Sequence, residues 1–303
     1  MAPDYAHAKL CDASTEYCGD GMGSASSSSS SSAAGSRGGR IRLNPAVLPV
    51  DKGFGIETIY FDSSVDFALV KGFGRVGAAI SPSASEETFF GPPGFESSTD
   101  LLDRKRGRHK FKSQKYTLAG AFNIVNNRKS GFERFAINLG GMVKYNTVSK
   151  QIKPGLGLTG VLGPLSFGYS RYGDQYAVDA MDPVTGQQPT VFNYNVETYS
   201  VGAFIGPIIL DYSLMRFLES DDSKVSMLTG TLLWSRALIT ASMRTENITR
   251  LTYNYDKDLL EITPSKVEYF YGLQYSMWDS VLLGVFYNYY LVRDISFGVT
   301  VFF

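Results

Sequence analysis

The sequence predicts an all-β protein, a transmembrane antiparallel β-barrel of about 14 strands with an N-terminal hatch or plug segment. Apolar residues alternate with small or polar ones, as where Ile295, Phe297 and Val299 alternate with Ser296 and Gly298. A period of two sends successive side chains to opposite faces of a strand. The alternating segments are roughly ten residues long, which is the length of a tilted strand that crosses a bilayer. Aromatic residues gather towards segment ends, as they do at the two interfaces of a membrane.

The composition supports a barrel rather than a helical membrane protein. The 303 residues include 19 Tyr, 20 Phe and 31 Gly, and no stretch approaches the roughly 18 consecutive apolar residues of a membrane helix. A soluble β-sandwich is the alternative, but one face is too uniformly apolar over too many segments for a solvated sheet. The formal net charge of +0 argues against nucleic acid as a partner.

The first fifty residues differ from the rest, so we expect two regions: residues 1–50 as a flexible Ser-rich arm and hatch, and residues 51–303 as the barrel. Ser26 to Ser32 is an unbroken run that cannot bury a core. Cys11 and Cys18 could form a disulfide in an oxidising periplasm, and only His7 lies near them, so we expect no metal site. Met1 to Leu10 has neither a charged nor an apolar signal region, so we expect the given chain to be a mature form.

The strands are expected to follow one another as hairpins. Short connections at 72, 127–130, 163–164, 206–207, 235 and 279–280 alternate with a set that includes the long ones, 82–111, 178–191 and 247–265. Short periplasmic turns and longer extracellular loops alternate in this way in bacterial barrels. The predicted strands are 53–61, 64–71, 73–81, 112–126, 132–147, 153–162, 165–177, 192–206, 208–218, 224–234, 236–246, 266–278, 281–291 and 294–303, and twelve strands is the alternative count.

A short motif stands directly before the first predicted strand. The segment of about fifty residues ends in Asn44-Pro45-Ala46. Together with about 14 strands, this resembles the outer-membrane long-chain fatty-acid transporter family (FadL-like), in which a hatch carrying Asn-Pro-Ala plugs the barrel. The alternating end that closes on Phe303 also resembles the C-terminal signature of bacterial outer-membrane barrels. These resemblances imply a bacterial outer-membrane location, outer-membrane lipids around the barrel, and the barrel-assembly machinery as a partner.

The face opposite the lipid-facing rows should line the lumen. If Ile295, Leu283 and Tyr271 face lipid, the lumen mixes apolar side chains with few charges, unlike the polar, water-filled lumen of a general porin. Apolar concave sites with a few polar groups bind hydrophobic ligands; alternatively, the same residues only pack the hatch against the wall. The predicted ligand path is Phe204, Leu238, Phe270, Trp278 and Phe286, and the predicted polar lumen residues are Lys144, Asp211, Arg244 and Glu268.

A basic run ends the first long connection. It suggests attachment to lipopolysaccharide phosphates or capture of an anionic headgroup, and a merely solvated loop is the alternative. The predicted anion contacts are Arg104, Lys105, Arg106, Arg108 and Lys110.

The sequence offers little for catalysis. A barrel hydrolase needs a histidine that an acidic group orients, and only His7 and His109 are present, the latter among cations. Residues 72–77 match a GxGxxG spacing, but a strand follows them instead of a helix, so no nucleotide cofactor is expected. The function that we expect is passive transport of fatty-acid-like or aromatic molecules and no enzyme activity. The alternative is a structural or interaction barrel, such as a secretion-system partner or an adhesion protein, that uses loops 82–111 and 247–265.

Overall fold

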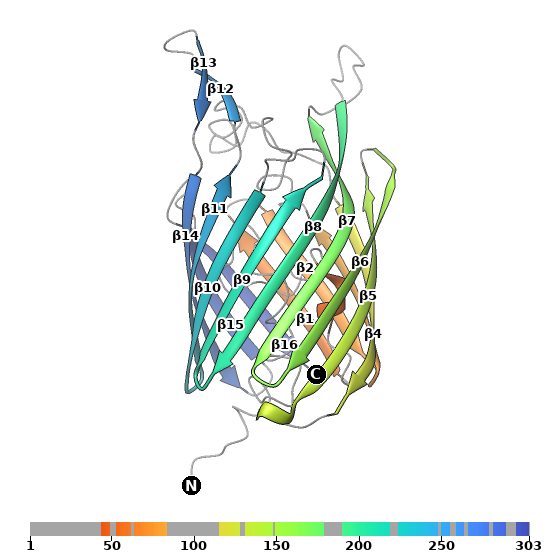
Figure 1. Cartoon of the computed structure of the whole chain (residues 1–303), viewed down its shortest axis with the longest axis vertical. Coiled ribbons are helices and arrows are strands. Elements are labelled where there is room, and N and C mark those ends of the chain that lie inside the picture. The colour runs from red at the N-terminus through yellow and green to blue at the C-terminus, as the bar shows by residue number, and fades with distance from the viewer. Residues whose placement is uncertain are drawn as a thin grey trace.

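The computed structural model is a closed barrel of 14 antiparallel strands (Figure 1). The first and last strands pair with each other, with Ile56 opposite Val301, which closes the wall. The other neighbours in the wall follow the chain as hairpins. The structure describes residues 44–48, 53–61, 64–83, 115–127, 131–147, 149–178, 190–218, 224–247, 250–254, 259–263, 266–278, 281–288 and 295–302.

The wall strands confirm the predicted spans to within a few residues, and the largest differences that the structure describes are at the starts of the third and fifth strands. They are β1 (Gly53–Phe61), β2 (Ser64–Gly72), β3 (Val76–Ser83), β4 (Lys115–Asn126), β5 (Phe135–Asn146), β6 (Ile152–Leu162), β7 (Leu165–Val178), β8 (Thr190–Ile205), β9 (Ile208–Phe217), β10 (Lys224–Trp234), β11 (Ala237–Asn247), β14 (Lys266–Trp278), β15 (Val281–Asn288) and β16 (Ile295–Phe302).

Three details of the predicted strands and connections were wrong. The fifth strand begins at Phe135 instead of 132, because Gly131–Glu133 forms a single 3₁₀ turn, η3. The third strand begins at Val76 instead of 73, because Phe73 N donates to Val76 O at 2.8 Å and Gly74 has a φ of 113°, so that the turn occupies 73–75 and not Gly72 alone. The predicted connection 247–265 contains a separate hairpin of β12 (Arg250–Asn254) and β13 (Leu259–Thr263). This hairpin extends beyond the rim at the end away from the short turns (Figure 1).

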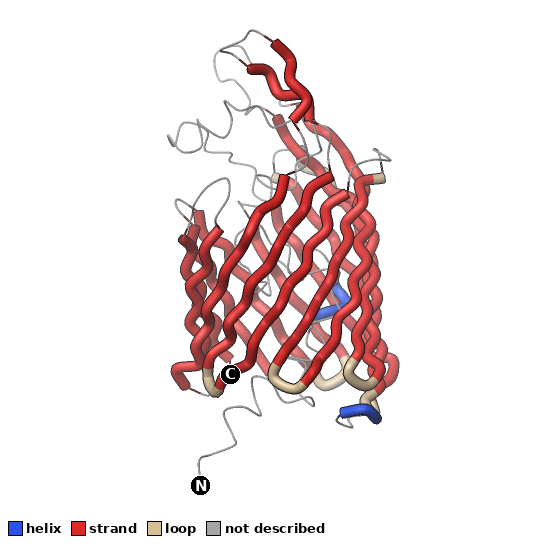
Figure 2. Tube along the Cα trace, turned by 60° about the vertical axis from the view of Figure 1, so that its left-hand side comes forward, coloured by secondary structure: helices blue, strands red, loops and turns tan. Residues whose placement is uncertain are grey.

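The short turns lie together at one end of the barrel (Figure 2). Gly163 and Gly206 carry positive φ values of 57° and 59°, and each is followed by a proline. Glycine adopts this left-handed conformation without steric cost, and proline has no amide hydrogen that the ladder would leave unpaired. Grouping of the short turns at one end agrees with the predicted order of the connections.

Successive side chains alternate between the outside and the inside of the wall. In β9, Leu210 and Tyr212 are exposed, whereas Ile209, Asp211 and Ser213 are buried. The predicted outward residues Tyr271 and Ile295 are exposed, and Leu283 is partly exposed. The distribution of polarity is therefore opposite to that of a water-soluble sheet: large apolar side chains cover the outer face, and many buried inward groups are polar.

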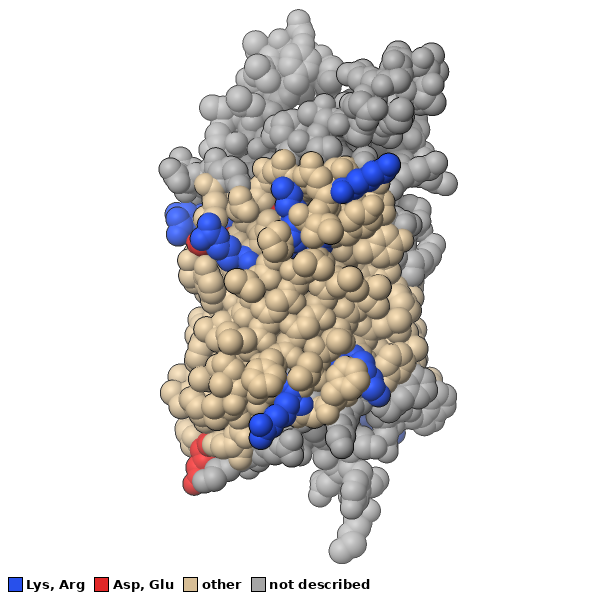
Figure 3. All heavy atoms as spheres, turned by 90° about the vertical axis from the view of Figure 1, so that its right-hand side faces the viewer, with Lys and Arg blue, Asp and Glu red and all other residues tan. Residues whose placement is uncertain are grey.

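The outer face carries its charges in two zones. On the face in Figure 3, Lys and Arg side chains lie above and below a band of uncharged residues. A barrel that spans a membrane has an apolar band of this kind between two polar margins. Within the described ranges, no helix is long and apolar enough to span a membrane.

Candidate functional site in the barrel lumen

The Asn-Pro-Ala motif forms a capped turn inside the barrel. Pro45–Val47 is a single 3₁₀ turn, η1, and the Asn44 side-chain oxygen accepts a hydrogen bond from Ala46 N at 3.0 Å. Asparagine is a favoured residue before a helical turn, and proline suits its first position because the turn needs no donor there. Asn44, Pro45 and Ala46 are all buried.

The turn is anchored to the wall by hydrogen bonds from strands far along the chain. Asn44 Nδ2 donates to the carbonyl oxygens of Leu158 and Tyr169, at 3.3 and 3.4 Å. Thr159 Oγ1 donates to Ala46 O at 3.2 Å. The side-chain oxygen of Asn44 therefore stabilises the 3₁₀ turn, and its side-chain nitrogen binds the turn to the wall.

Where the Asn-Pro-Ala turn contacts the wall, the inward residues of the strands are glycine and serine. Gly140 of β5, Gly157 of β6 and Ser170 of β7 are paired in register. A Cβ atom at Gly140 would lie 2.4 Å from Ala46 N, and one at Gly157 would lie 2.0 Å from Asn44 Oδ1. These distances are much shorter than a van der Waals contact, so a larger side chain at either position would occupy the space of the turn. We call Gly140 and Gly157 the seat of the turn.

An apolar layer lies next to the seat, further from the short turns. Two residues beyond Gly140 and Gly157 along their rows, Met142, Gly155 and Tyr172 are paired. A Cβ atom at Gly155 would meet Tyr172 Cβ at 2.6 Å and Met142 Cε at 2.7 Å. The glycine therefore lets the methionine and the tyrosine pack over β6.

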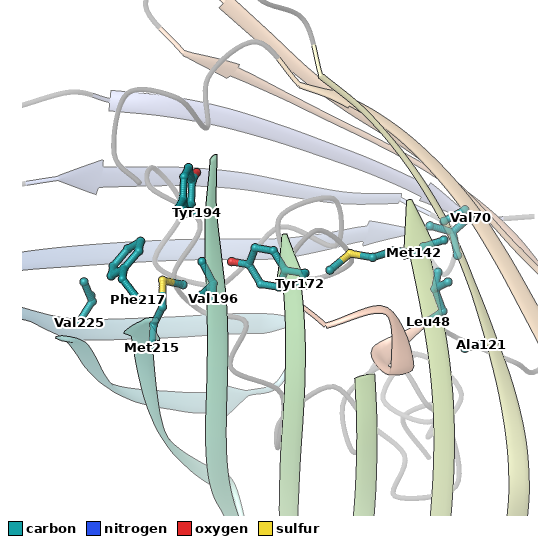
Figure 4. Packing of buried hydrophobic residues seen from close by; sticks show 12 residues of the cluster. Leu48, Val70, Ala121, Met142, Tyr172, Tyr194, Val196, Met215, Phe217 and Val225 are labelled. Atoms are coloured by element: carbon teal, nitrogen blue, oxygen red, sulfur yellow. The ribbon is translucent and has the colours of Figure 1, made fainter. Parts of the chain in front are cut away.

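This layer continues around the wall and includes Leu48, which directly follows the Asn-Pro-Ala turn (Figure 4). Tyr194 and Phe217 stack with ring centroids 6.0 Å apart at an interplanar angle of 49°, a separation at which tilted aromatic pairs attract. Leu48, which directly follows η1, is 1% exposed. The members of this buried cluster, which we call the apolar layer, are Leu48, Val70, Ala79, Ala119, Ala121, Met142, Tyr172, Tyr194, Val196, Met215, Phe217 and Val225.

A buried ion pair borders the apolar layer. Lys144 Nζ lies 2.8 Å from Asp174 Oδ2, with side-chain exposures of 4% and 7%. The same nitrogen lies 4.0 Å from the centre of the Tyr172 ring, within the range of a cation–π interaction. The lysine charge is thus already compensated by one carboxylate and one aromatic face.

The structure brings together only some of the predicted site residues. Lys144, Asp211 and Arg244 are buried, as expected of polar lumen residues. Lys144 lies beside the apolar layer, whereas Asp211 and Arg244 lie on β9 and β11, the two neighbours of β10. The side chain of Glu268 lies outside the described part, and in register the residue pairs with Arg244.

The structure describes the side chains of two of the five predicted ligand-path residues. Phe204 and Leu238 are half-buried near the short-turn end and do not belong to the apolar layer. Phe270, Trp278 and Phe286 lie in strands whose side chains at these positions are outside the described part. The described part also does not include the two cysteines, the two histidines or the basic run of Arg104, Lys105, Arg106, Arg108 and Lys110. Sequence reasoning did not single out the residues of the apolar layer, whose methionine and aromatic members come from β5, β7, β8 and β9. Their alternation with exposed residues could have indicated them.

Comparison with known proteins gives fold-level likeness. No family model matches the chain, and no curated protein matches it. Among solved structures, the CymD monoaromatic hydrocarbon channel is similar with a TM-score of 0.46 and 11% identity over 86% of this chain and 90% of that one. The Acinetobacter baumannii outer membrane protein Omp33 is similar with a TM-score of 0.42 and 9% identity, over 83% of this chain and 96% of that one. A mutant of the Rh. blastica porin is similar with a TM-score of 0.41 and 10% identity, over 83% of this chain and 98% of that one. None of these likenesses assigns a substrate to this chain.

Proposed function

We propose that this protein is a passive channel of the bacterial outer membrane for hydrophobic small molecules. The outer face supports the membrane location, because outward side chains at mid-strand are large and apolar, among them Leu118, Leu210 and Val285. The observation that carries the function is the apolar layer, which lies inside the barrel directly beside a docked hatch.

An apolar layer in the lumen favours apolar passengers over ions and sugars. Water-filled channels are lined by polar and charged groups, whereas here methionine, tyrosine, valine and phenylalanine side chains from β5 to β9 face inward together. Methionine adapts its shape to different partners, and aromatic rings offer flat apolar contact. The hatch contributes Leu48 to the same layer, so a displacement of the hatch would expose apolar surface to an arriving ligand.

The ion pair beside the apolar layer favours neutral ligands over carboxylates. A carboxylate that entered the layer would need a free cation, and Lys144 is held by Asp174 at 2.8 Å. A neutral aromatic or aliphatic molecule requires no such partner and loses no charge hydration on entry. Within the proposed channel, we therefore expect a neutral hydrocarbon such as toluene to bind in preference to dodecanoate.

The proposed function is tested by removing apolar side chains from the layer. In the variant Met215→Ser/Phe217→Ser, toluene binding to the purified barrel should weaken by roughly tenfold or more, because burial of one such side chain is worth about 1.5–3 kcal/mol. The assay is native mass spectrometry with toluene uptake into vesicles. Leu210→Ser, which removes an outward side chain of the same strand, is the control and should bind as the original does.

Two results would contradict the proposal. One is equal toluene binding by the lumen variant and the original protein. The other is an original protein that holds no apolar ligand but forms a stable protein complex through the hairpin of β12 and β13, which would favour the interaction barrel.

The preference for neutral ligands gives a second prediction. Asp174→Asn keeps the side-chain shape but removes the charge that compensates Lys144. Dodecanoate binding should then rise relative to toluene binding, since the freed ammonium group can pair with a carboxylate. The ratio of the two affinities is the measurement, and Asp211→Asn is the control at a buried carboxylate on another strand. An unchanged ratio in Asp174→Asn would show that Lys144 does not select ligands.

A further inference from the structure

A row of charged side chains crosses the outer face of four neighbouring strands. Arg171 of β7 pairs in register with Glu197 of β8, which pairs with Arg216 of β9, which pairs with Lys224 of β10. The three cationic residues are exposed, and Glu197 is mostly covered. We call these four residues the outer charged row.

The row stands against an apolar background. Large outward residues of the same strands on the side of the short turns include Phe167, Tyr199, Tyr212 and Leu228, which are 41–49% exposed. A charge on a lipid-facing surface is destabilising at mid-membrane and tolerated near the interface, where long cationic side chains can extend to the headgroups. Lys224 is the first residue of β10, at the end opposite the short turns, so the row reaches the outer rim.

The carboxylate of the row is already occupied. Tyr169 Oη donates to Glu197 Oε1 at 3.3 Å, and Tyr199 Oη donates to Oε2 at 3.0 Å. Arg171 Nη1 lies 3.6 Å from Oε1, yet the arginine side chain remains 60% exposed. Within the described residues, Glu197 forms an ion pair with Arg171 alone, and the row holds three cations and one carboxylate, so the row itself carries more positive than negative charge.

We propose that the outer charged row binds the phosphate groups of a lipid in the outer leaflet, such as lipid A. Guanidinium groups form paired hydrogen bonds with phosphate, and a lysine adds a point charge. The two tyrosine hydroxyl groups bind both oxygens of Glu197, which leaves this outward carboxylate mostly covered beside Arg171. The proposal rests on the membrane location proposed above but not on any ligand in the lumen.

The test measures binding of purified lipid A to the full-length barrel in detergent micelles by native mass spectrometry. The triple variant Arg171→Gln/Arg216→Gln/Lys224→Gln should bind lipid A roughly tenfold more weakly or worse, since it removes every charge-assisted hydrogen bond that the row can donate to a phosphate. The matched control, Arg75→Gln/Arg236→Gln, removes exposed arginines at the short-turn end and should bind lipid A as the original does.

A second variant protects the test against misfolding. Glu197→Gln keeps all three cations and removes the competing carboxylate, so lipid A binding should become tighter, whereas a purely structural role for the row predicts no such gain. Lipid A without phosphate should not compete, and inorganic phosphate should compete only weakly.

Several outcomes would overturn the proposal. One is that the triple variant and its control bind lipid A equally well. Another is that the original protein binds inorganic phosphate as well as it binds lipid A. A third is that a second copy of the chain binds to the row. Insertion into phospholipid vesicles is measured separately. A barrel that fails to insert contradicts the membrane location, whereas an inserted barrel without lipid A binding contradicts the lipid site alone.

Discussion

The variant Gly140→Ala/Gly157→Ala is expected to turn the barrel into an open pore. The added methyl groups would lie 2.4 Å from Ala46 N and 2.0 Å from Asn44 Oδ1, so the hatch turn cannot stay in its seat. The hydrogen bonds from Asn44 to the carbonyl oxygens of β6 and β7 would be lost with it. In planar bilayers, the ion conductance of the variant should rise to that of a chain lacking residues 40–50.

A glycine next to the seat provides the control. Gly141 is the neighbour of Gly140 in β5, and a Cβ atom there meets nothing within 4 Å. Gly141→Ala should leave the conductance at the level of the original protein, although it makes the same chemical change in the same strand. If the seat variant conducts no better than Gly141→Ala, or if deletion of residues 40–50 has no effect, the hatch does not block the lumen.

Val299→Arg is expected to destabilise the inserted barrel by about 2–4 kcal/mol, the range for an arginine on the lipid face at mid-membrane. Val299 lies inside β16, is 42% exposed and pairs with Leu283 on one side and Thr58 on the other. The new charge would lie in the apolar band, and its side chain must bend to reach water. Denaturant unfolding from vesicles measures the free energy of unfolding.

The position along the strand supplies the comparison. Ile295 is the first residue of β16, and an arginine near a membrane interface costs only about 0–1 kcal/mol. Ile295→Arg should therefore destabilise the barrel much less than Val299→Arg. Equal losses at the two positions, or no loss at either, would show that this face is not in a lipid bilayer.

The barrel was predictable because its signals are local. Alternation with period two marks each strand, and residues such as Gly163-Pro164 and Gly206-Pro207 mark the turns, so fourteen spans can be identified without knowledge of the fold. The hairpin of β12 and β13 escaped prediction because its short segments carry charged and polar residues among apolar ones, such as Arg250 and Glu261.

The lumen was less predictable, because its chemistry depends on register between strands. Alternation indicates that Met142 and Tyr172 face inward, but not that Gly155 brings them together. The Asn-Pro-Ala motif could be identified by its position, whereas its seat on Gly140 and Gly157 depends on where a distant segment docks. The predicted ligand path in the last strands stays a prediction, whereas the methionine and aromatic side chains of the apolar layer come from β5, β7, β8 and β9.

The location of the hatch seat also has a consequence for the order of assembly. The seat consists of β5, β6 and β7, which follow one another in the chain, and the Asn44 contacts join residues 114 and 125 positions apart. The pairing of β1 with β16, for example Ile56 with Val301, joins residues about twice as far apart in the chain. Because the entropy lost in closing a loop grows with its length, contacts between nearer residues form more readily. We expect the hatch to dock on a still open sheet and to be enclosed when the chain ends meet, so that a nascent barrel never passes through a leaky stage.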